Sequence, residues 1–370
     1  MKIGIDKINF YVPQRYIDMT DLAEARGVDP AKFHIGLGQD QMAVTTANED
    51  IITLGANAAS EILTAEDRAA IDLVIVGTES SVDESKASAV ILHNLLGIQP
   101  FARAYEIKEA CYSGTAALMM AKQHVEAHPE QKALVIAADI ARYGLNSSGE
   151  PTQGAGAVAM LVSVNPSILA LEDDSVALSQ DIYDFWRPTG EAFPRVEGKL
   201  SNETYIDSFS QVWDEYKVRT GLDFSDFAAL AFHTPYTKMG KKALQPQTDD
   251  AHLFAEFENA IAYNRRVGNL YTGSLYLSLI SLLENSTDLK EGQRIGLFSY
   301  GSGAVAEFFS AKLVDGFEQH LRTEEHRKLL DSRQKLTIAE YEQVFTSKEI
   351  LPSDEKFSLS EISGGVRYYN

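Results

Sequence analysis

The stretch Gly154-Ala155-Gly156-Ala157-Val158-Ala159 returns later in the chain as Gly301-Ser302-Gly303-Ala304-Val305-Ala306. A second pair, Tyr112-Ser113-Gly114-Thr115 and Tyr271-Thr272-Gly273-Ser274, stands in the same order relative to the first pair. The period is roughly 150 residues, which is too long for a solenoid unit and indicates a duplicated domain. We therefore expect two halves that share one fold.

Apolar runs of strand length alternate with helical patterns in both halves. In the first half we expect strands over 73–76, 133–137 and 160–162, and helices over 50–63 and 114–126. In the second half we expect strands over 229–232, 294–299 and 304–309, and a helix over 273–283. This alternation predicts an α/β protein whose halves are layers of helices around buried sheets.

The boundary between the two halves is placed at residue 167. Residues 1–167 form the first half, and residues 168–370 form the second. The segment 168–224 is richer in polar and aromatic residues, and we interpret it as a cap insertion. The tail 318–370 is charged and is expected to be a mostly helical outer layer, packed through Leu321, Leu329, Leu330, Leu336 and Ile338.

Composition limits the class of protein. The chain has 370 residues, 45% of them hydrophobic, a net charge of -20 and one cysteine, which excludes an intramolecular disulfide. The amino terminus lacks a secretory leader, and no apolar run reaches membrane-spanning length, so we expect a cytoplasmic protein. The negative charge disfavours nucleic acid and anionic membrane surfaces as partners. An anionic ligand would need a local basic patch.

The single cysteine lies where small and hydroxylated residues give way to a helical pattern, in Glu109-Ala110-Cys111-Tyr112-Ser113-Gly114. Unpaired N–H groups and the helix dipole at such a position favour the thiolate and lower the pKa of a cysteine. Cys111 is therefore a candidate nucleophile. The alternative is a small buried hydrophobic residue.

Two further reactive side chains end strand-like apolar runs. Glu79 follows 71–77, and His233 follows 227–232. An acidic residue at a strand end is often only exposed to water and has no catalytic role, and a single histidine is often a hydrogen-bonded core residue.

His124 and His128 stand four residues apart on a helical stretch, but no third ligand for zinc is visible near them, so we expect no metal site there.

Six motifs distributed over nearly the whole chain resemble the bacterial type of 3-hydroxy-3-methylglutaryl-CoA synthase. They are Ile35-Gly36-Leu37-Gly38-Gln39, Glu109 to Ala116, Asp184-Phe185-Trp186-Arg187-Pro188, His233-Thr234-Pro235-Tyr236-Thr237-Lys238, Gly268-Asn269-Leu270-Tyr271-Thr272 and Phe298 to Gly303. The resemblance implies a thiolase-like fold of two pseudo-duplicated αβαβα halves. It also implies a homodimer that uses no metal and no redox cofactor.

The reaction implied by the resemblance joins acetyl-CoA, acetoacetyl-CoA and water to give 3-hydroxy-3-methylglutaryl-CoA and CoA, a step of the mevalonate pathway to isoprenoids. A soft thiolate suits acyl transfer from a thioester, and this role falls to Cys111. Removal of a methyl proton needs a base whose pKa is raised by burial, and this role falls to Glu79. His233 would polarise the acceptor carbonyl. Water would then hydrolyse the acyl-cysteine.

Binding residues follow from the same motifs. The resemblance assigns Asn269 to hold substrate near His233, and it assigns four residues to the acetoacetyl pocket: Tyr143, Thr152, Phe185 and Ser201. Lys238 and Lys242, which share a helix face, would contact the phosphates of coenzyme A, with Lys241 as a weaker candidate. The turn around Ser302 and the N–H of Cys111 would stabilise negative charge on thioester oxygens.

Other functions remain to be weighed. A ketoacyl-carrier-protein synthase III would use Cys, His and Asn without this glutamate, and a thiolase would need a second cysteine, which the chain lacks. A synthase that adds a β-branch to a carrier-protein-bound chain in polyketide assembly would share Cys111, Glu79 and His233, so these residues cannot exclude it. A non-catalytic CoA-ester binder would be expected to have lost at least one of the three.

Overall fold

The computed structural model describes all residues, 1–370, and is built around one sheet of ten strands. Nine of the strands follow one another across the sheet in the order β12 (Ala229–Phe232), β13 (Arg294–Gly301), β14 (Val305–Leu313), β8 (Leu169–Leu171), β1 (Ile3–Tyr11), β7 (Gly154–Val164), β6 (Lys132–Ala141), β4 (Ile71–Gly77) and β5 (Arg103–Ile107). The tenth strand, β9 (Val176–Ser179), pairs with β14. Each expected strand and helix lies within an observed one or overlaps it closely.

The duplication is visible in the strand pairing. In the first half β4 runs parallel to β6, and β6 runs antiparallel to β7. In the second half β12 runs parallel to β13, and β13 runs antiparallel to β14. The repeated glycine-alanine segments begin β7 and lead into β14, so they occupy equivalent places. Strands β1 and β8 join the two halves edge to edge.

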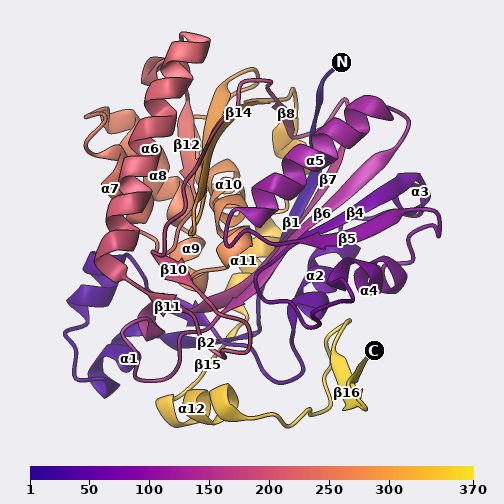
Figure 1. The fold of residues 1–370 in the computed structure, drawn as a ribbon, viewed down its shortest axis with the longest axis vertical. Helices are drawn as coiled ribbons and strands as arrows, with labels where there is room; N and C mark the ends of the chain where they lie inside the picture. Colours follow the sequence, from indigo (N-terminus) through magenta and orange to yellow (C-terminus); the bar gives the residue numbers. More distant parts are fainter.

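Helices divide the fold into layers (Figure 1). Helices α5 (Ser113–Ala127) and α10 (Ser274–Asn285) lie in the centre and share one large core with strands of both halves. Helices α2 (Ile51–Ser60) and α4 (Ser88–Leu95) cover the outer face of the first half, and α6 (Gly198–Thr220), α7 (Met239–Leu244) and α8 (Ala251–Ile261) cover that of the second. The layers confirm the thiolase-like α/β fold.

Side chains of the strands alternate between these layers. Leu73 and Ile75 of β4 face the central helices, whereas Val74 and Val76 face α2 and α4. Both faces of the strand are thus buried, which explains why its sequence is a continuous apolar run rather than an alternating one. The strand end, where this run stops, is the first place that a polar side chain can reach a cavity.

The expected cap at 168–224 needs correction. Its first part supplies strands β8 and β9 of the central sheet, and its last part is α6, which buries Phe209 and Trp213 against the second half. Only 180–197, with the short strands β10 (Phe185–Trp186) and β11 (Arg195–Val196), lies outside the layers. The sequence misled because the strands are short and the aromatic residues belong to a core.

The tail is only partly helical. Helices α11 (Thr323–Asp331) and α12 (Ile338–Thr346) are present, with a short strand β15 (Gln334–Lys335) between them. Residues after 346 were expected to be helical, but they contain a hairpin of β16 (Leu359–Ser363) and β17 (Val366–Tyr369). Leu330 and Leu336 are buried, whereas Leu321, Leu329 and Ile338 are partly exposed. No helix in the structure combines the length and apolar character needed to cross a membrane.

Candidate active site

The duplicated strands place the reactive residues together. Glu79 follows the end of β4 by two residues, and His233 follows the end of β12, which is the equivalent strand of the second half. Cys111 lies in the turn that enters α5. Cys111 hydrogen-bonds Glu79 and lines one cavity together with His233, so three residues far apart in sequence reach one region.

The turn that carries Cys111 is held in an uncommon backbone conformation. Ala110 has a φ of 40°, in the left-handed region that non-glycine residues seldom adopt. Strand-end glycines pack against this turn: a Cβ atom on Gly301 would lie 2.6 Å from the carbonyl oxygen of Glu109, and one on Gly77 would lie 2.7 Å from the nitrogen of Gly114. These glycines are therefore required for the close approach of both halves to the nucleophile.

Glu79 and Cys111 interact directly. The thiol of Cys111 donates a hydrogen bond of 3.3 Å to Oε1 of Glu79. Glu79 is buried, with 8% of its surface exposed. Burial raises the pKa of Glu79 to about 8, and the negative charge of Asp139 adds to this effect. A carboxyl with such a pKa can accept and return a proton near neutral pH, as the sequence predicted for a catalytic base.

The pKa of Cys111 corrects the expectation of a helix-activated thiolate. Burial raises its pKa well above the ordinary value, and the neighbouring carboxylates of Glu79 and Asp139 raise it further. Helix α5 does start two residues later, at Ser113. Its dipole is opposed by anionic neighbours, so ionisation of Cys111 requires that its proton be taken by a base at the same moment.

Asp139 is a site residue that the sequence analysis missed. It is fully buried on β6. Its Oδ1 accepts hydrogen bonds from the N–H of Glu79 and the hydroxyls of Thr78 and Ser80, and its Oδ2 accepts from Thr272. It thus fixes the backbone of the base and raises its pKa. The one feature of the sequence that marks Asp139 is that a charged residue stands inside an otherwise apolar strand.

His233 is neutral in the structure. It is 2% exposed, and burial lowers its pKa to about 3. Its N–H is fixed by the carbonyl of Phe298 on β13, its carbonyl accepts from the hydroxyl of Tyr205, and its ring nitrogen Nδ1 has no hydrogen-bond partner. The ring lines the pocket described next. A neutral imidazole can donate one hydrogen bond to a carbonyl oxygen.

A cavity of about 290 Å³ collects most of the candidates. Its lining includes every substrate-binding candidate and two of the three catalytic ones: Cys111, Tyr143, Thr152, Phe185, Ser201, His233, Asn269 and Ser302. Glu79 lies behind Cys111 and lines a neighbouring cavity of about 280 Å³. There Arg187 donates a hydrogen bond to the carbonyl oxygen of Glu79.

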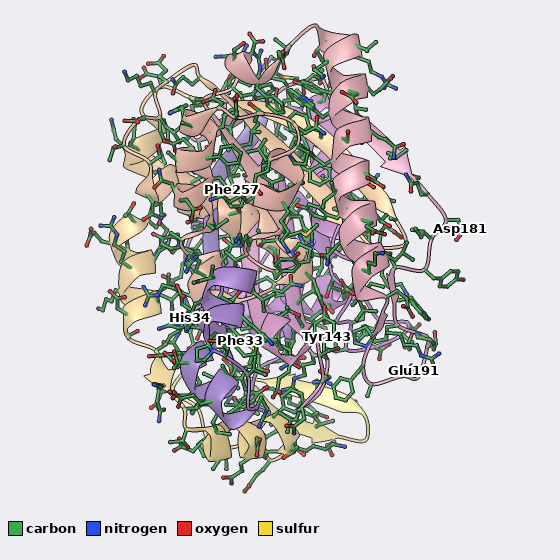
Figure 2. The ribbon with its side chains drawn as sticks, turned by 90° about the vertical axis from the view of Figure 1, so that its left-hand side faces the viewer. Phe33, His34, Tyr143, Asp181, Glu191 and Phe257 are labelled. Atoms are coloured by element: carbon green, nitrogen blue, oxygen red, sulfur yellow. The ribbon has the colours of Figure 1, made fainter.

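Aromatic residues form one wall of this pocket. Tyr143, Phe185 and Tyr271 contact one another edge to face, with ring centroids 5.9 to 6.3 Å apart. In Figure 2 Tyr143 lies between the segment that carries Phe33 and the loop that carries Glu191. Tyr271 was not among the predicted site residues, although the repeat makes it the counterpart of Tyr112, which follows the nucleophile directly.

Asn269 and Ser302 have free donors toward the pocket. Oδ1 of Asn269 accepts hydrogen bonds from the N–H of Tyr271 and the hydroxyl of Ser274, which leaves its Nδ2 without a protein acceptor. The N–H groups of Cys111 and Ser302 also lack acceptors in the protein. The N–H of Gly303 donates to Asp184 instead. Of the predicted glycine turn, therefore, Ser302 supplies the available donor.

The lysines differ in how they are paired. Nζ of Lys238 donates to the carbonyl of Ile35, and Nζ of Lys242 donates to the hydroxyl of Tyr236, which lines the pocket. Neither lysine has a carboxylate partner. Lys241 forms an ion pair of 2.8 Å with Glu258. Lys238 and Lys242 are thus available for an anion, Lys242 through its contact with a pocket residue, whereas Lys241 is a poor candidate.

Comparison with known protein families agrees with this geometry. The model described as "Hydroxymethylglutaryl-coenzyme A synthase N terminal" matches residues 1–167, and its C-terminal companion matches residues 173–251 and 248–362.

Individual relatives cover the whole chain. The hydroxymethylglutaryl-CoA synthase of Enterococcus faecalis is 65% identical over 381 aligned residues, with 100% of each chain covered. The polyketide biosynthesis 3-hydroxy-3-methylglutaryl-ACP synthase PksG of Bacillus subtilis is 34% identical, with 92% of this chain and 87% of that protein covered. A crystal structure of an HMG-CoA synthase complexed with CoA superposes with a TM-score of 0.98 at 48% identity, covering 100% of this chain and 99% of the other.

Proposed function

This chain belongs to the hydroxymethylglutaryl-CoA synthase family, and we propose that its pocket joins acetyl-CoA to acetoacetyl-CoA through an acetyl group carried by Cys111. The observation that carries the assignment of residues is the hydrogen bond between Cys111 and Glu79, because it pairs a nucleophile with a base of raised pKa. The product is 3-hydroxy-3-methylglutaryl-CoA, an intermediate of the mevalonate pathway to isoprenoids.

The first step is acetyl transfer. Oε1 of Glu79 takes the thiol proton as Sγ of Cys111 attacks the thioester carbonyl of acetyl-CoA. The carbonyl oxygen becomes negative, and the free N–H groups of Cys111 and Ser302 are suited to stabilise it. Collapse of this intermediate expels the CoA thiolate, which recovers the proton from Glu79. This leaves Glu79 as the carboxylate that the next step requires.

The second step forms the carbon–carbon bond. The carboxylate of Glu79 removes a proton from the methyl group of the acetyl-cysteine, and the resulting carbon nucleophile attacks the ketone carbon of acetoacetyl-CoA. The N–H of the neutral imidazole of His233 polarises the ketone and hydrogen-bonds the new alkoxide, which takes the proton that Glu79 removed from the methyl group. Nδ2 of Asn269 supports the same oxygen. Water finally hydrolyses the thioester to Cys111, which leaves a free carboxylate on the product.

Coenzyme A is proposed as the carrier of both substrates. The identity to the E. faecalis HMG-CoA synthase is 65%, against 34% to the ACP-dependent relative, which favours the CoA-dependent function. In a chain with a net charge of -20, Lys238 and Lys242 supply the positive charge that the phosphates of coenzyme A require. No metal or redox cofactor is needed for any of these steps.

Peptide mass spectrometry after incubation with acetyl-CoA tests the role of Cys111. We expect an acetyl adduct on the Cys111 peptide, and an unmodified peptide would refute the mechanism. Replacement of Glu79→Gln should slow acetylation, because Glu79 takes the thiol proton, but long incubation should still acetylate Cys111, and condensation should be abolished. Release of CoA with acetoacetyl-CoA and with an acetoacetyl carrier protein as alternative acceptors distinguishes the two members of the family. Faster turnover of the carrier-bound acceptor would favour the polyketide function instead.

The state and location of the enzyme are also proposals. We expect a homodimer, because members of the resembled family are dimers and because β5 is an edge strand whose outer hydrogen-bonding groups a second copy can pair with. Light scattering coupled to size exclusion measures this. We expect the cytoplasm, because a catalytic thiol without a disulfide partner suits a reducing compartment.

A further inference from the structure

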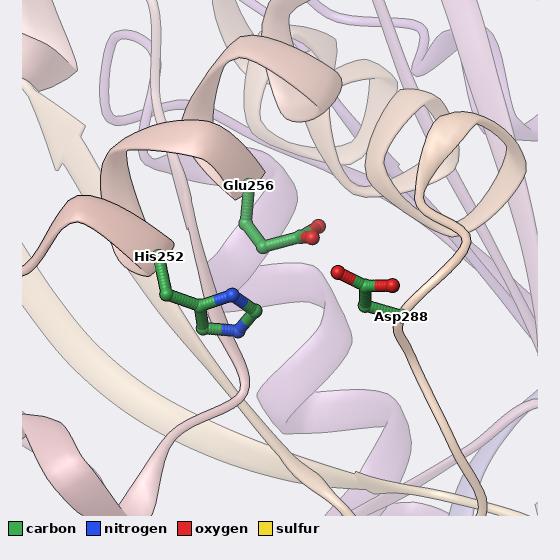
Figure 3. Close-up of side chains that lie close together, drawn as sticks. All are labelled: His252, Glu256 and Asp288. Carbon is green, nitrogen blue, oxygen red and sulfur yellow. The ribbon is translucent and has the colours of Figure 1, made fainter.

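A cluster of metal-ligand side chains lies outside the active-site pocket, on the second half of the molecule. His252 and Glu256 are four residues apart on α8 and therefore project from one face of that helix. Asp288 lies in the loop that follows α10. Figure 3 shows the two carboxylates facing each other, with the imidazole beside them. None of the three side chains lines the active-site pocket.

One atom from each of these side chains fits around a single ion. The three ligand atoms all lie within 4.8 Å of one another. Ligand atoms around one zinc ion stand roughly 3 to 4 Å apart, because each lies about 2 Å from the metal. His252 and Asp288 are exposed, so small rotations of their side chains can close the remaining difference.

Glu256 is a nearly buried carboxylate without a positively charged partner in the protein. Its side chain is almost wholly buried, with 2% of the residue exposed. Oε2 accepts one long hydrogen bond, 3.3 Å from Nδ2 of Asn259, whereas Oε1 has no partner. No lysine or arginine pairs with Glu256 or Asp288, and the lysine that contacts α8, Lys241, is already paired with Glu258. Buried carboxylates normally have such a partner.

We propose that His252, Glu256 and Asp288 bind a zinc ion, with water as the fourth ligand. One imidazole nitrogen with two carboxylates is a ligand set that zinc accepts in tetrahedral geometry. Magnesium prefers an octahedral shell of oxygen ligands, so the histidine selects against it. The bound ion links α8 to the loop after α10 and compensates two facing negative charges. The site stabilises the second half and takes no part in the condensation.

The backbone holds two of the ligands in place without the metal. The N–H of His252 donates to the side chain of Asp250 at the start of α8, over 2.8 Å. The N–H of Asp288 donates to the hydroxyl of Ser286 over 3.2 Å. Substitution of the His252 or Asp288 side chain leaves these backbone bonds intact, so variants at both exposed positions are expected to fold.

Isothermal titration of chelator-treated full-length protein with Zn²⁺ tests the proposal. The Cys111→Ser background removes the only thiol that would compete for the ion. We expect one zinc ion per chain and a rise in melting temperature with zinc but not with Mg²⁺. His252→Ala and Asp288→Asn should each weaken zinc binding about tenfold or more.

The matched control is His128→Ala, because His128 is also exposed and stands four residues after another histidine, directly after the end of α5. It should leave the zinc affinity unchanged. The proposal is overturned if the protein binds no zinc, or if His252→Ala binds zinc as the parent does. It is also overturned if Glu256→Gln raises the melting temperature without zinc and leaves zinc binding unchanged, since a shared proton then explains the carboxylate pair.

Discussion

Raising the pH from 7 to 9 should accelerate carbon–carbon bond formation about tenfold. The step requires Glu79 as a carboxylate, and burial next to Asp139 raises its pKa to about 8. About 9% of the base is then ionised at pH 7 and about 91% at pH 9. The cysteine thiol that donates to Glu79 in the free enzyme lowers this pKa. Acetylation removes that donor, so the midpoint in the acetyl-enzyme should lie at 8 or above.

His233 adds no second limb to this profile. Burial lowers its pKa to about 3, so the imidazole stays neutral throughout the range from pH 6 to pH 9. The rate of condensation should therefore rise with pH along a single titration curve and then level off. An additional loss of rate below pH 6.5, steeper than the titration of Glu79 alone gives, would show that the histidine titrates in an ordinary environment.

A single-turnover experiment isolates this step. The enzyme is first acetylated with acetyl-CoA, then mixed rapidly with acetoacetyl-CoA at pH 6 to 9.5, and the product is measured by chemical quench. The Glu79→Gln variant is the control and should lose about 100- to 10,000-fold in rate, together with the pH dependence. A rate that is flat from pH 6 to 9, or a midpoint near the ordinary glutamate value of about 4.3, would refute the raised pKa.

Three further predictions follow from the packing of the site. The native state binds the Glu79 proton more tightly than the unfolded chain does, so the free energy of unfolding of the wild type should fall as pH rises toward and through 8. Urea unfolding should show a loss of about 3 kcal/mol between pH 6 and 9. The Glu79→Gln variant should not show this loss. In steady-state assays, Lys242→Ala should raise the KM for acetyl-CoA severalfold with little change in kcat. Lys241→Ala should leave the KM unchanged, because Lys241 is paired with Glu258. Equal effects of the two substitutions would show that neither lysine is a specific phosphate contact. Gly301→Ala should destabilise the protein by about 1 to 3 kcal/mol and slow the burst of CoA release. The reason is that the new Cβ would lie 2.6 Å from the carbonyl oxygen of Glu109, in the turn that carries Cys111. An unchanged burst would mean that this turn can move freely.

The zinc site adds a prediction that is independent of catalysis. Loss of zinc binding in His252→Ala should leave the turnover of acetyl-CoA and acetoacetyl-CoA unchanged, because the cluster lies outside the pocket. Steady-state kinetics of the zinc-free variant and of the zinc-loaded parent check this. A loss of activity in the variant would show that α8 transmits a structural change to the pocket.

Local patterns located part of the regular structure and missed other long elements, among them β1 (Ile3–Tyr11) and α6 (Gly198–Thr220). Strands β4, β6 and β12 and helices α5 and α10 were predicted because both faces of each are buried or because their helical period is strong. Strands β8 and β9 were also missed, since β8 has only three residues and β9 is partly exposed, whereas the four residues of β12 are all buried and apolar. The tail hairpin was missed because its residues are mostly exposed and polar, and no apolar face marks it.

The site was located in outline by motif and could be completed only in three dimensions. Cys111 and His233 stand out in the sequence through their neighbours, and both line the pocket. Asp139 and Tyr271 come from other elements and contact the site only through the fold. Lys241 was already a weaker phosphate candidate than Lys238 and Lys242, and its ion pair with Glu258 gives a structural reason for that difference.

The sequence by itself determined the duplication, the family and the chemical types of the reacting groups, because these depend on residue identity and order along the chain. The tertiary structure decided the ionisation states. A helix start should have activated the thiol of Cys111, yet burial and two nearby carboxylates raise its pKa and make Glu79 the partner that must take its proton. Burial and the distance between charges set a pKa, and both exist only after strands from distant parts of the chain have been brought together.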